Sequence, residues 1–367
     1  MKKLSVGVIG CGVISEIYLR NMLTLFGDTL DVVACADKNP AASSARGKQF
    51  GVAATSVDEL IAREDVELIV NLTNPAAHFE VSKRALLAGK HVYSEKPLAG
   101  SLAEGRELLA LAKNRGLLVA SAPDTFLGAG LQTALEVIGR GEIGAPVHAY
   151  GFMLDWGPES FHPAPAFYYE PGAGPLMDMG PYYFTALAVL LGAATRVSGM
   201  ASSLKPTRVV QNKTSPLYGT QFQSKVATSI SASIEYKCGA TANVVTTWDV
   251  QNPYQASGLP QLMVYGTQGA LILPDPNFFG GVSDPATGKP GKYLKLKKGA
   301  GGFEDIPLVA GFTQDSRGLG VYKMARQVLY GEKSDLTGQL SLHVLEMLLG
   351  VLESAKSGSN YTMETTL

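Results

Sequence analysis

The sequence predicts a two-domain α/β fold, in which a parallel doubly wound sheet precedes an α+β domain with a large open, mostly antiparallel sheet. Strand-like and helix-like runs alternate from residue 4 to about 121, as they do in proteins built from βαβ units. After Ser121, strand patterns follow one another with few helices between them. A length of 367 residues also suits two domains, which we place at 1–121 and 122–367.

A glycine-rich turn stands between the first strand pattern, 4–9, and a helical pattern at 16–26. Gly10 permits a tight turn, and Gly12 lets backbone N–H groups approach a pyrophosphate at the positive end of the helix. Ser15 occupies the place of a third glycine, where only a small residue fits against the strand. The pattern predicts a Rossmann dinucleotide-binding domain. The turn residues expected at the cofactor are Gly10, Cys11, Gly12, Val13 and Ile14.

The second strand pattern, 30–36, ends in Asp37, about 20 residues beyond the glycines, where dinucleotide-binding proteins place an acidic residue. A carboxylate there accepts hydrogen bonds from ribose hydroxyls and repels a 2′-phosphate, which favours NAD. Lys38 offsets part of this repulsion, so NADP is not excluded. The alternative is an Asp-Lys-Asn-Pro turn that only ends the strand and caps the next helix.

The remaining elements of the N-terminal domain alternate in the same way. Capping boxes at Ser56 with Glu59 and at Ser101 with Glu104 mark two helix starts independently of the apolar pattern. Further strand patterns lie at 66–73, 91–94 and 117–120, and helical patterns lie at 75–88 and 102–114.

The C-terminal region is predicted to contain antiparallel hairpins and a few helices. Two pairs of strand patterns are separated by short glycine-containing turns, as in β-hairpins. These pairs are 227–236 with 240–248 and 261–265 with 270–273, and the helical patterns cover 131–140, 319–330 and 339–355. The stretch 274–302 is rich in Gly, Pro and Lys and is predicted to be a surface excursion.

Composition excludes several kinds of partner and cofactor. Lys and Arg number 31 and Asp and Glu 32, so a net charge of −1 favours neither nucleic acid nor an anionic membrane. Apolar runs fall short of the ~20 residues of a membrane span. Cys11, Cys35 and Cys238 show no paired spacing, which argues against disulfides and zinc and favours the cytoplasm. The histidines lack metal-ligand spacing, so no metal is predicted.

An acid, a phenol and an amine form the candidate catalytic group. A helix expected to begin near Asp178 would carry Asp178, Tyr182 and Thr185 on one face, because they are four and three residues apart. Lys96 follows the strand pattern at 91–94, at the carboxyl end of a parallel strand, where ligands bind. The alternatives are a core aromatic for Tyr182, a solvated lysine for Lys96 and a helix N-cap for Asp178.

Carbinol–carbonyl chemistry would give each of these residues a role. Tyr182 is the expected general acid/base, and the Lys96 ammonium stabilises its phenolate and contacts the nicotinamide ribose. Lys96 itself is the alternative proton carrier. Asp178 is the expected anchor for a substrate hydroxyl.

Three motifs resemble the Gfo/Idh/MocA family of oxidoreductases: the Gly-Cys-Gly turn, Glu95-Lys96-Pro97, and the stretch from Gly174 to Tyr182 with its Asp-Met-Gly-Pro-Tyr. The resemblance spans most of the chain. It implies a Rossmann domain followed by an open sheet with one face over the nicotinamide and another used in a homodimer or homotetramer. Many members carry histidine at the position of Tyr182, whereas sugar oxidoreductases and dihydrodiol dehydrogenases carry tyrosine.

Further contacts are expected around both ligands. Thr73, Asn74, His78 and Glu95 are expected near the cofactor. A loop at 156–169, rich in aromatic residues, precedes the catalytic helix and is expected to fold over a sugar ring, with Trp156 and His162 as substrate contacts. The segment 124–126 replaces an arginine-containing stretch of many members, so their substrate contacts do not transfer.

The resemblance implies an NAD(P)-dependent oxidoreductase that transfers hydride between nicotinamide and a carbinol or carbonyl of a sugar, inositol or related polyol. One alternative is an NAD-dependent glycosidase or epimerase that oxidises its substrate only transiently. Another is a non-catalytic regulator that senses the cofactor. Lys96, Asp178 and Tyr182 favour an enzyme over the regulator.

Overall fold

The protein is represented by a computed structural model, which describes residues 2–250, 260–283, 291–309 and 311–367. Its chain forms two compact units, Met1–Leu127 with Ser316–Leu345 and Gly128–Asp315 with Glu346–Leu367. The C-terminal region therefore returns to the first unit before it re-enters the second. The functional division at 1–121 and 122–367 stays a prediction.

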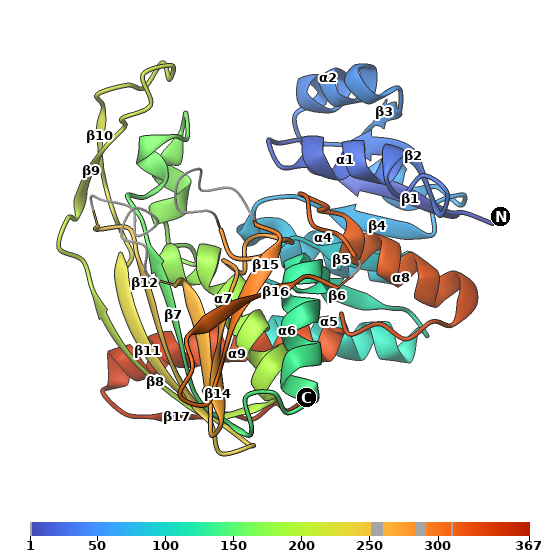
Figure 1. The fold of residues 1–367 in the computed structure, drawn as a ribbon. Helices are drawn as coiled ribbons and strands as arrows, with labels where there is room; N and C mark the ends of the chain where they lie inside the picture. The colour runs from blue at the N-terminus through green and yellow to red at the C-terminus, as the bar shows by residue number, and fades with distance from the viewer. Residues whose placement is uncertain (1, 251–259, 284–290, 310) are drawn as a thin grey trace. The chain divides into compact units, whose positions relative to one another are not determined.

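The first unit contains a six-stranded parallel sheet in the order β3-β2-β1-β4-β5-β6 (Figure 1). Its strands are β1 (Leu4–Ile9), β2 (Leu30–Ala36), β3 (Ala53–Thr55), β4 (Leu68–Asn71), β5 (His91–Ser94) and β6 (Val119–Ser121). The strand order reverses at β1, and ligands bind such sheets outside the carboxyl ends of the strands near this point. The predicted doubly wound sheet is confirmed.

Helices flank this sheet and complete its core. They are α1 (Ser15–Thr24), α2 (Pro40–Phe50), α3 (Val57–Ala62), α4 (Pro75–Leu87), α5 (Leu102–Asn114), the 3-10 helix η1 (Thr125–Leu127) and α8 (Leu319–Tyr330). α1 packs beside α2, and α4 packs beside α5. Both predicted capping boxes are present, at Ser56 with Glu59 and at Ser101 with Glu104.

The second unit is built on a nine-stranded sheet in the order β16-β15-β14-β13-β7-β12-β11-β8-β17. Of the described strand pairs in it, β7 with β12 is parallel and the others are antiparallel, as predicted. The strands are β7 (Pro146–Leu154), β8 (Ala194–Ser202), β11 (Ser229–Tyr236), β12 (Thr241–Thr247), β13 (Leu262–Gly266), β14 (Gly269–Leu273), β15 (Tyr293–Lys298), β16 (Phe303–Pro307) and β17 (Tyr361–Thr362).

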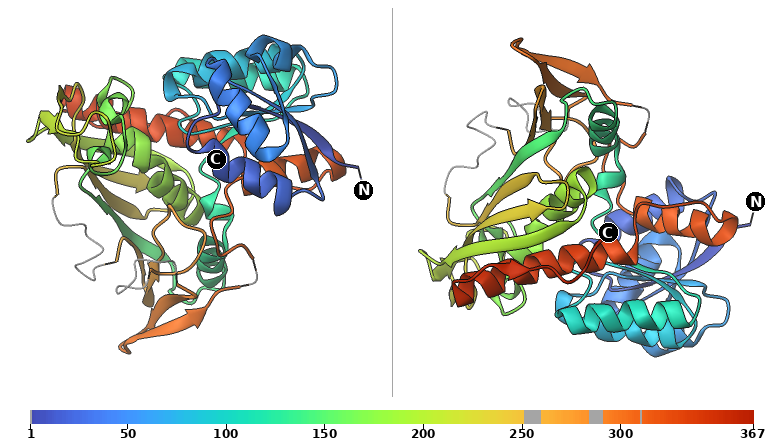
Figure 2. Two further views of the ribbon diagram at one scale, coloured as in Figure 1. Left: turned by 90° about the horizontal axis from the view of Figure 1, so that it is seen from above. Right: turned by 90° about the horizontal axis from the view of Figure 1, so that it is seen from below.

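Helices cover one face of this large sheet. α6 (Ala129–Gly139) packs against β14 and β15, and α7 (Pro175–Leu191) packs against β7, β11 and β12. The C-terminal part of α9 (Gly338–Ser357), in red, lies beside α7 (Figure 2). Because one face of the sheet packs against helices, side chains along β11 alternate between buried and exposed. Ile230, Ala232 and Ile234 are buried, while Ser231 and Ser233 are exposed.

The predicted surface excursion at 274–302 is wrong for much of its described part. Phe279 is buried against the backbone of Gly128. β15 is an internal strand that pairs with β14 and β16 and buries Leu294 and Leu296. Lysines at alternate positions of this strand gave it the composition of a loop. Residues 284–290 lie outside the described part of the chain.

Candidate cofactor site and active site

The glycine-rich turn has the geometry that a dinucleotide needs. Gly10 has a φ of +103°, and a Cβ there would lie 2.5 Å from the backbone of Leu72. Gly12 has nothing within 4 Å of the corresponding position, so its backbone faces open space. Ser15 is fully buried and donates a hydrogen bond to the Gly12 carbonyl at 2.6 Å. The residues present therefore suit a closely approaching pyrophosphate.

Asp37 joins this turn to the end of β2. Its carboxylate accepts hydrogen bonds from the backbone N–H of Cys11 at 2.7 Å and of Asn39 at 2.8 Å. The cap of α2 is Asn39, whose side chain accepts from the N–H of Ala41. The Asp-Lys-Asn-Pro turn therefore does cap the next helix, through Asn39, and Asp37 in addition binds the glycine turn.

A cavity of about 900 Å³ lies beside these residues. It is lined by Gly10, Gly12, Asp37, Thr73 and Asn74, among others. Its size falls in the range of small-molecule and cofactor pockets. Five of the predicted cofactor residues therefore share one cavity within the first unit.

His78 connects two loops at the carboxyl edge of the sheet. Its ring is buried, with Nδ1 2.7 Å from the Pro97 carbonyl and Nε2 3.0 Å from the Thr73 carbonyl. Burial lowers the pKa of His78, while the two backbone contacts oppose this shift. His78 thus contacts the backbone of the loops that carry Asn74 and Lys96.

Glu95 is held by α1. Its Oε1 accepts a hydrogen bond from the Tyr18 hydroxyl at 2.8 Å, and its Oε2 accepts from the Lys96 N–H at 3.1 Å. Tyr18 is completely buried, and burial raises the pKa of its phenol. The loop after β5 is consequently anchored, and the partly exposed Lys96 side chain starts from a fixed backbone.

The acid and the phenol lie on α7 in the second unit, in the predicted helical spacing. α7 begins at Pro175 with Gly174 as N-cap, three residues before the predicted start. Proline favours the first helical position because its φ is already suitable. Asp178 therefore lies in the first turn, and the interpretation of Asp178 as the N-cap is wrong.

The two adjacent tyrosines of α7 have different surroundings. Tyr183 is fully buried and donates its hydroxyl to the Phe152 carbonyl at 3.1 Å. Tyr182 is 8% exposed and lies one helical turn after the partly exposed Asp178. Tyr183 is therefore a core aromatic, whereas Tyr182, also largely buried, shares a side of the helix with Asp178.

The aromatic loop, residues 156–169, is part of the second unit and includes the 3-10 helices η2 (Pro158–Ser160) and η3 (Pro165–Tyr169). Trp156 is 36% exposed and Phe167 46% exposed. The ring of His162 lies roughly perpendicular to the rings of Phe167 and Tyr168, with centroids 5.3 and 5.4 Å away. Partial burial lowers the pKa of His162, whose Nδ1 accepts from the N–H of Ala164.

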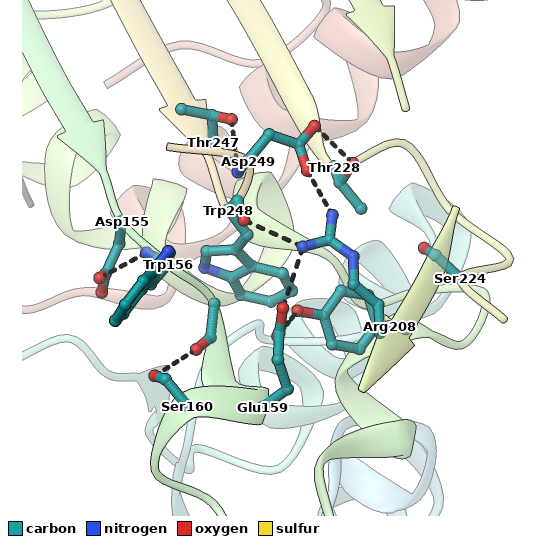
Figure 3. Close-up of polar contacts among 12 residues, drawn as sticks. Asp155, Trp156, Glu159, Ser160, Arg208, Ser224, Thr228, Thr247, Trp248 and Asp249 are labelled. Carbon is teal, nitrogen blue, oxygen red and sulfur yellow. Dashed lines mark hydrogen bonds and ion pairs between the residues drawn. The ribbon is translucent and has the colours of Figure 1, made fainter. Parts of the chain in front are cut away.

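Two buried acidic sites were not predicted from sequence. Arg208 pairs with Glu159 of the aromatic loop and with Asp249 (Figure 3). Asp124 accepts hydrogen bonds from the N–H groups of Gly318 and Gly320, both at 2.9 Å, at the start of α8. Both sites join residues far apart in the chain, so no local pattern marks them.

The described residues contain neither a metal-ligand cluster nor a membrane-spanning helix. In the described ranges, no group of three or more His, Cys, Asp or Glu side chains is placed to hold a metal ion. None of the helices formed by the same residues is both long and apolar enough to cross a bilayer.

Comparison with known proteins finds a sugar reductase and a sugar dehydrogenase among its relatives. The chain is 33% identical over 203 residues to dTDP-3,4-didehydro-2,6-dideoxy-alpha-D-glucose 3-reductase from Streptomyces violaceoruber, over 54% of this chain and 58% of that protein. It is 23% identical to levoglucosan dehydrogenase from Pseudarthrobacter phenanthrenivorans, over 74% of each chain. The chain thus spans little more than half the length of the first of these relatives.

Solved structures and family models extend the likeness to both units. A structure of levoglucosan dehydrogenase in complex with NADH superposes with a TM-score of 0.83 at 18% identity, covering 99% of this chain and 100% of that one, which shows the fold. Residues 4–122 match the oxidoreductase family with an NAD-binding Rossmann fold, and residues 131–272 match the GFO/IDH/MocA C-terminal domain. The chain belongs to the Gfo/Idh/MocA family of oxidoreductases.

Proposed function

We propose that this protein is an NAD(P)-dependent oxidoreductase that transfers hydride between nicotinamide and a carbinol or carbonyl of a sugar, inositol or related polyol. The observation that carries the proposal is the placement of Asp178 and Tyr182 one turn apart on α7, with Tyr183 taking the core position. A carboxylate and a phenol in this arrangement suit the binding and deprotonation of a hydroxyl.

NAD would be held by the first unit. The backbone at Gly10 and Gly12 would receive the pyrophosphate, and the cavity beside Asp37, Thr73 and Asn74 would receive the adenosine half. Each carboxylate oxygen of Asp37 already accepts one hydrogen bond and has a second lone pair for a ribose hydroxyl. When bound, NAD supplies or accepts the hydride. His78 and Glu95 would act by holding the loops of the site, and Cys11, Val13 and Ile14 would contribute backbone.

Proton transfer and stabilisation of the substrate oxygen would be carried out by side chains. Tyr182 would take the hydroxyl proton during oxidation and return it during reduction. The Lys96 ammonium would stabilise the developing negative oxygen, and Asp178 would accept a hydrogen bond from a neighbouring substrate hydroxyl. Lys96 belongs to the first unit and the other two to the second.

A sugar or polyol is the proposed substrate class because named relatives act on such compounds. These include the reductase and the levoglucosan dehydrogenase described above, and a 1,5-anhydro-D-fructose reductase from Ensifer adhaerens. The exposed aromatic side chains of Trp156 and Phe167, with His162 nearby, provide apolar faces and a polar group that suit a sugar ring.

We also propose a homodimer or homotetramer formed through the outer face of the large sheet, in the cytoplasm. Tyr265 is 39% exposed on this face, and Tyr150 packs against Tyr265 with ring centroids 5.9 Å apart. Light scattering after size-exclusion chromatography would test the assembly, with a monomeric mass as the contrary result.

The free thiols of Cys11, Cys35 and Cys238 support a reducing compartment.

The activity is tested by mixing the purified protein with NAD and a panel of polyols, sugars and glycosides. Reduced-nicotinamide absorbance and sugar products are followed together. Growth of absorbance with one substrate class is the expected result. Sugar product without absorbance growth would indicate transient oxidation, as in a glycosidase or epimerase. Tight NADH binding with neither product would favour a regulator.

A further inference from the structure

Arg208 is a buried charge that joins two segments of the second unit. One segment is the aromatic loop, and the other is the arm, residues 203–228, which contains the short ribbon of β9 (Thr207–Val209) and β10 (Gln221–Gln223). The side chain of Arg208 is 3% exposed, and those of Glu159 and Asp249 are 5% and 7% exposed. A guanidinium from the arm therefore lies among carboxylates from the loop and from the end of β12.

The contacts of this guanidinium are specific. Nη1 donates to Glu159 Oε1 and to the Trp248 carbonyl, both at 3.0 Å, while Nη2 pairs with Asp249 (Figure 3). The ring centroid of Tyr169 lies 5.1 Å from the guanidinium carbon, and the Tyr169 hydroxyl donates to Glu159. The hydrogen bonds have fixed directions, so the network defines one position of the loop relative to the arm.

Buried ions are costly unless their partners are well placed, often by several kcal/mol for each ion. Here Glu159 has two donors, and Asp249 receives a second hydrogen bond from Thr228 at 2.9 Å. Replacement of such a network by apolar residues is often neutral or stabilising, so stability alone is a weak reason for its presence. A fixed geometry is the better reason.

A second set of contacts holds the rim of the loop. The N–H of Gln211 donates to the Glu159 carbonyl at 2.8 Å, and the Asn212 side chain donates to the Phe161 carbonyl at 2.6 Å. Ser215 donates its hydroxyl to the Pro163 carbonyl at 2.5 Å. The arm thus satisfies backbone carbonyls that an exposed loop normally leaves to water.

The braced loop carries the aromatic ledge, which we define as His162, Phe167 and Tyr168. Their rings contact one another, with the Phe167 and Tyr168 centroids 4.1 Å apart. Tyr168 meets Trp248 edge to face at 6.1 Å, and Trp248 in turn provides the carbonyl bound by Arg208. A continuous chain of contacts therefore runs from the exposed ring of Phe167 to the buried guanidinium.

We propose that Arg208 is a positioning residue that fixes the aromatic ledge as a stacking surface for a sugar ring. The choice of a sugar rests on the proposed function. The brace, by which we mean the contacts of Arg208 and the arm that hold the aromatic loop, rests on the structure described above. Fixing the rings before binding reduces the entropy that the substrate must overcome, so the effect falls on substrate affinity. Arg208 touches no reacting atom in this account.

Three variants distinguish the loss of the loop contacts from a general loss of protein stability. Arg208→Lys keeps the charge but cannot reproduce the forked contacts. Asn212→Ala removes a loop contact without exposing a buried ion, and it carries the test if Arg208→Lys does not fold. Gln223→Ala is the control, because its side chain donates to Thr207 at 3.0 Å within the arm.

Tryptophan fluorescence reports on the loop. The chain has two tryptophans, and Trp156 is 36% exposed while Trp248 is 3% exposed, so quenching by acrylamide measures access to Trp156. We expect stronger quenching in Arg208→Lys and Asn212→Ala and wild-type quenching in Gln223→Ala. Unchanged quenching in both loop variants would overturn Arg208 as a brace.

Kinetics with levoglucosan and with myo-inositol then test the ledge. We expect KM to rise about tenfold in the loop variants, equivalent to the ordering of roughly one side chain, with kcat and NADH affinity nearly unchanged. A more accessible Trp156 with unchanged KM for both compounds would overturn the ledge as a substrate surface.

A binding titration separates this inference from the proposed activity. If the wild-type protein reduces no NAD with either compound, the same sugars are titrated while tryptophan fluorescence is followed. A sugar-dependent change that weakens in the loop variants would support the ledge while the redox proposal fails. Absence of any such change in the wild-type protein would overturn the ledge.

Discussion

The backbone N–H of Cys11 donates a hydrogen bond to the Asp37 carboxylate at 2.7 Å. This bond joins the glycine-rich turn after β1 to the end of β2. Asp37 therefore shapes the turn that would receive a pyrophosphate, in addition to its expected contact with ribose. A change at Asp37 should affect both halves of a dinucleotide.

Asp37→Ala should weaken NADH binding by about 10- to 100-fold, the range for loss of hydrogen bonds to a charged group. It should also narrow the preference for NADH over NADPH, because the repulsion of a 2′-phosphate is lost. Fluorescence titration with both nucleotides measures the two effects. Asn39→Ala removes the cap of α2 but leaves the Cys11 contact and serves as control. An unchanged ratio of the two affinities would remove Asp37 from the site.

Gly10→Ala and Gly12→Ala should separate folding from cofactor binding. Alanine at position 10 would have to adopt a φ of +103°, and its Cβ would lie 2.5 Å from the backbone of Leu72. This variant should therefore lose several kcal/mol of stability. A methyl group at Gly12 would meet nothing within 4 Å, so stability should stay near wild type while NADH binding falls at least about tenfold. Thermal unfolding and NADH titration make the comparison. Wild-type NADH affinity in Gly12→Ala would contradict the predicted cradle.

Asp124 should make the stability of the first unit depend on pH. Burial raises its pKa from 3.8 to about 6, despite hydrogen bonds from Gly318 and Gly320. The folded state therefore binds the proton more tightly, and this contribution to stability falls as pH rises from about 4 to 6. The shift of about two units corresponds to about 3 kcal/mol.

Asp124→Asn should remove that dependence. Between pH 4 and pH 7, the free energy of unfolding of the variant should gain about 3 kcal/mol relative to wild type, as measured by urea titration. Asp31→Asn, at an exposed site on β2, provides the control. Parallel pH profiles for wild type and Asp124→Asn would show that this carboxyl does not titrate as described.

Local patterns were sufficient for much of the first unit. β5 and α5 begin and end at the predicted residues, and the Ser101 capping box marks the start of α5. Ser15 is buried against the glycine turn, as expected of a small residue at that position. These features depend on neighbours within a few positions, which a single sequence reveals.

Long-range contacts were not predictable in the same way. Tyr18 and Glu95 are 77 residues apart, and Arg208 is 49 residues from Glu159 and 41 from Asp249. Each is an ordinary polar residue in its local sequence. The start of α7 was misplaced because Asp178 is a common helix-capping residue, whereas Gly174 and Pro175 supply the N-cap and first position.

The pair of adjacent tyrosines on α7 gives the most direct test of the proposed chemistry. With the substrate identified by the panel, kcat and NADH affinity are measured for Tyr182→Phe and Tyr183→Phe. We predict that Tyr182→Phe lowers kcat by roughly 10²- to 10⁴-fold and leaves NADH affinity unchanged. Tyr183→Phe should retain activity and lose about 1 kcal/mol of stability with its bond to Phe152. Near-wild-type turnover in Tyr182→Phe would contradict the assignment of Tyr182 as the general acid/base.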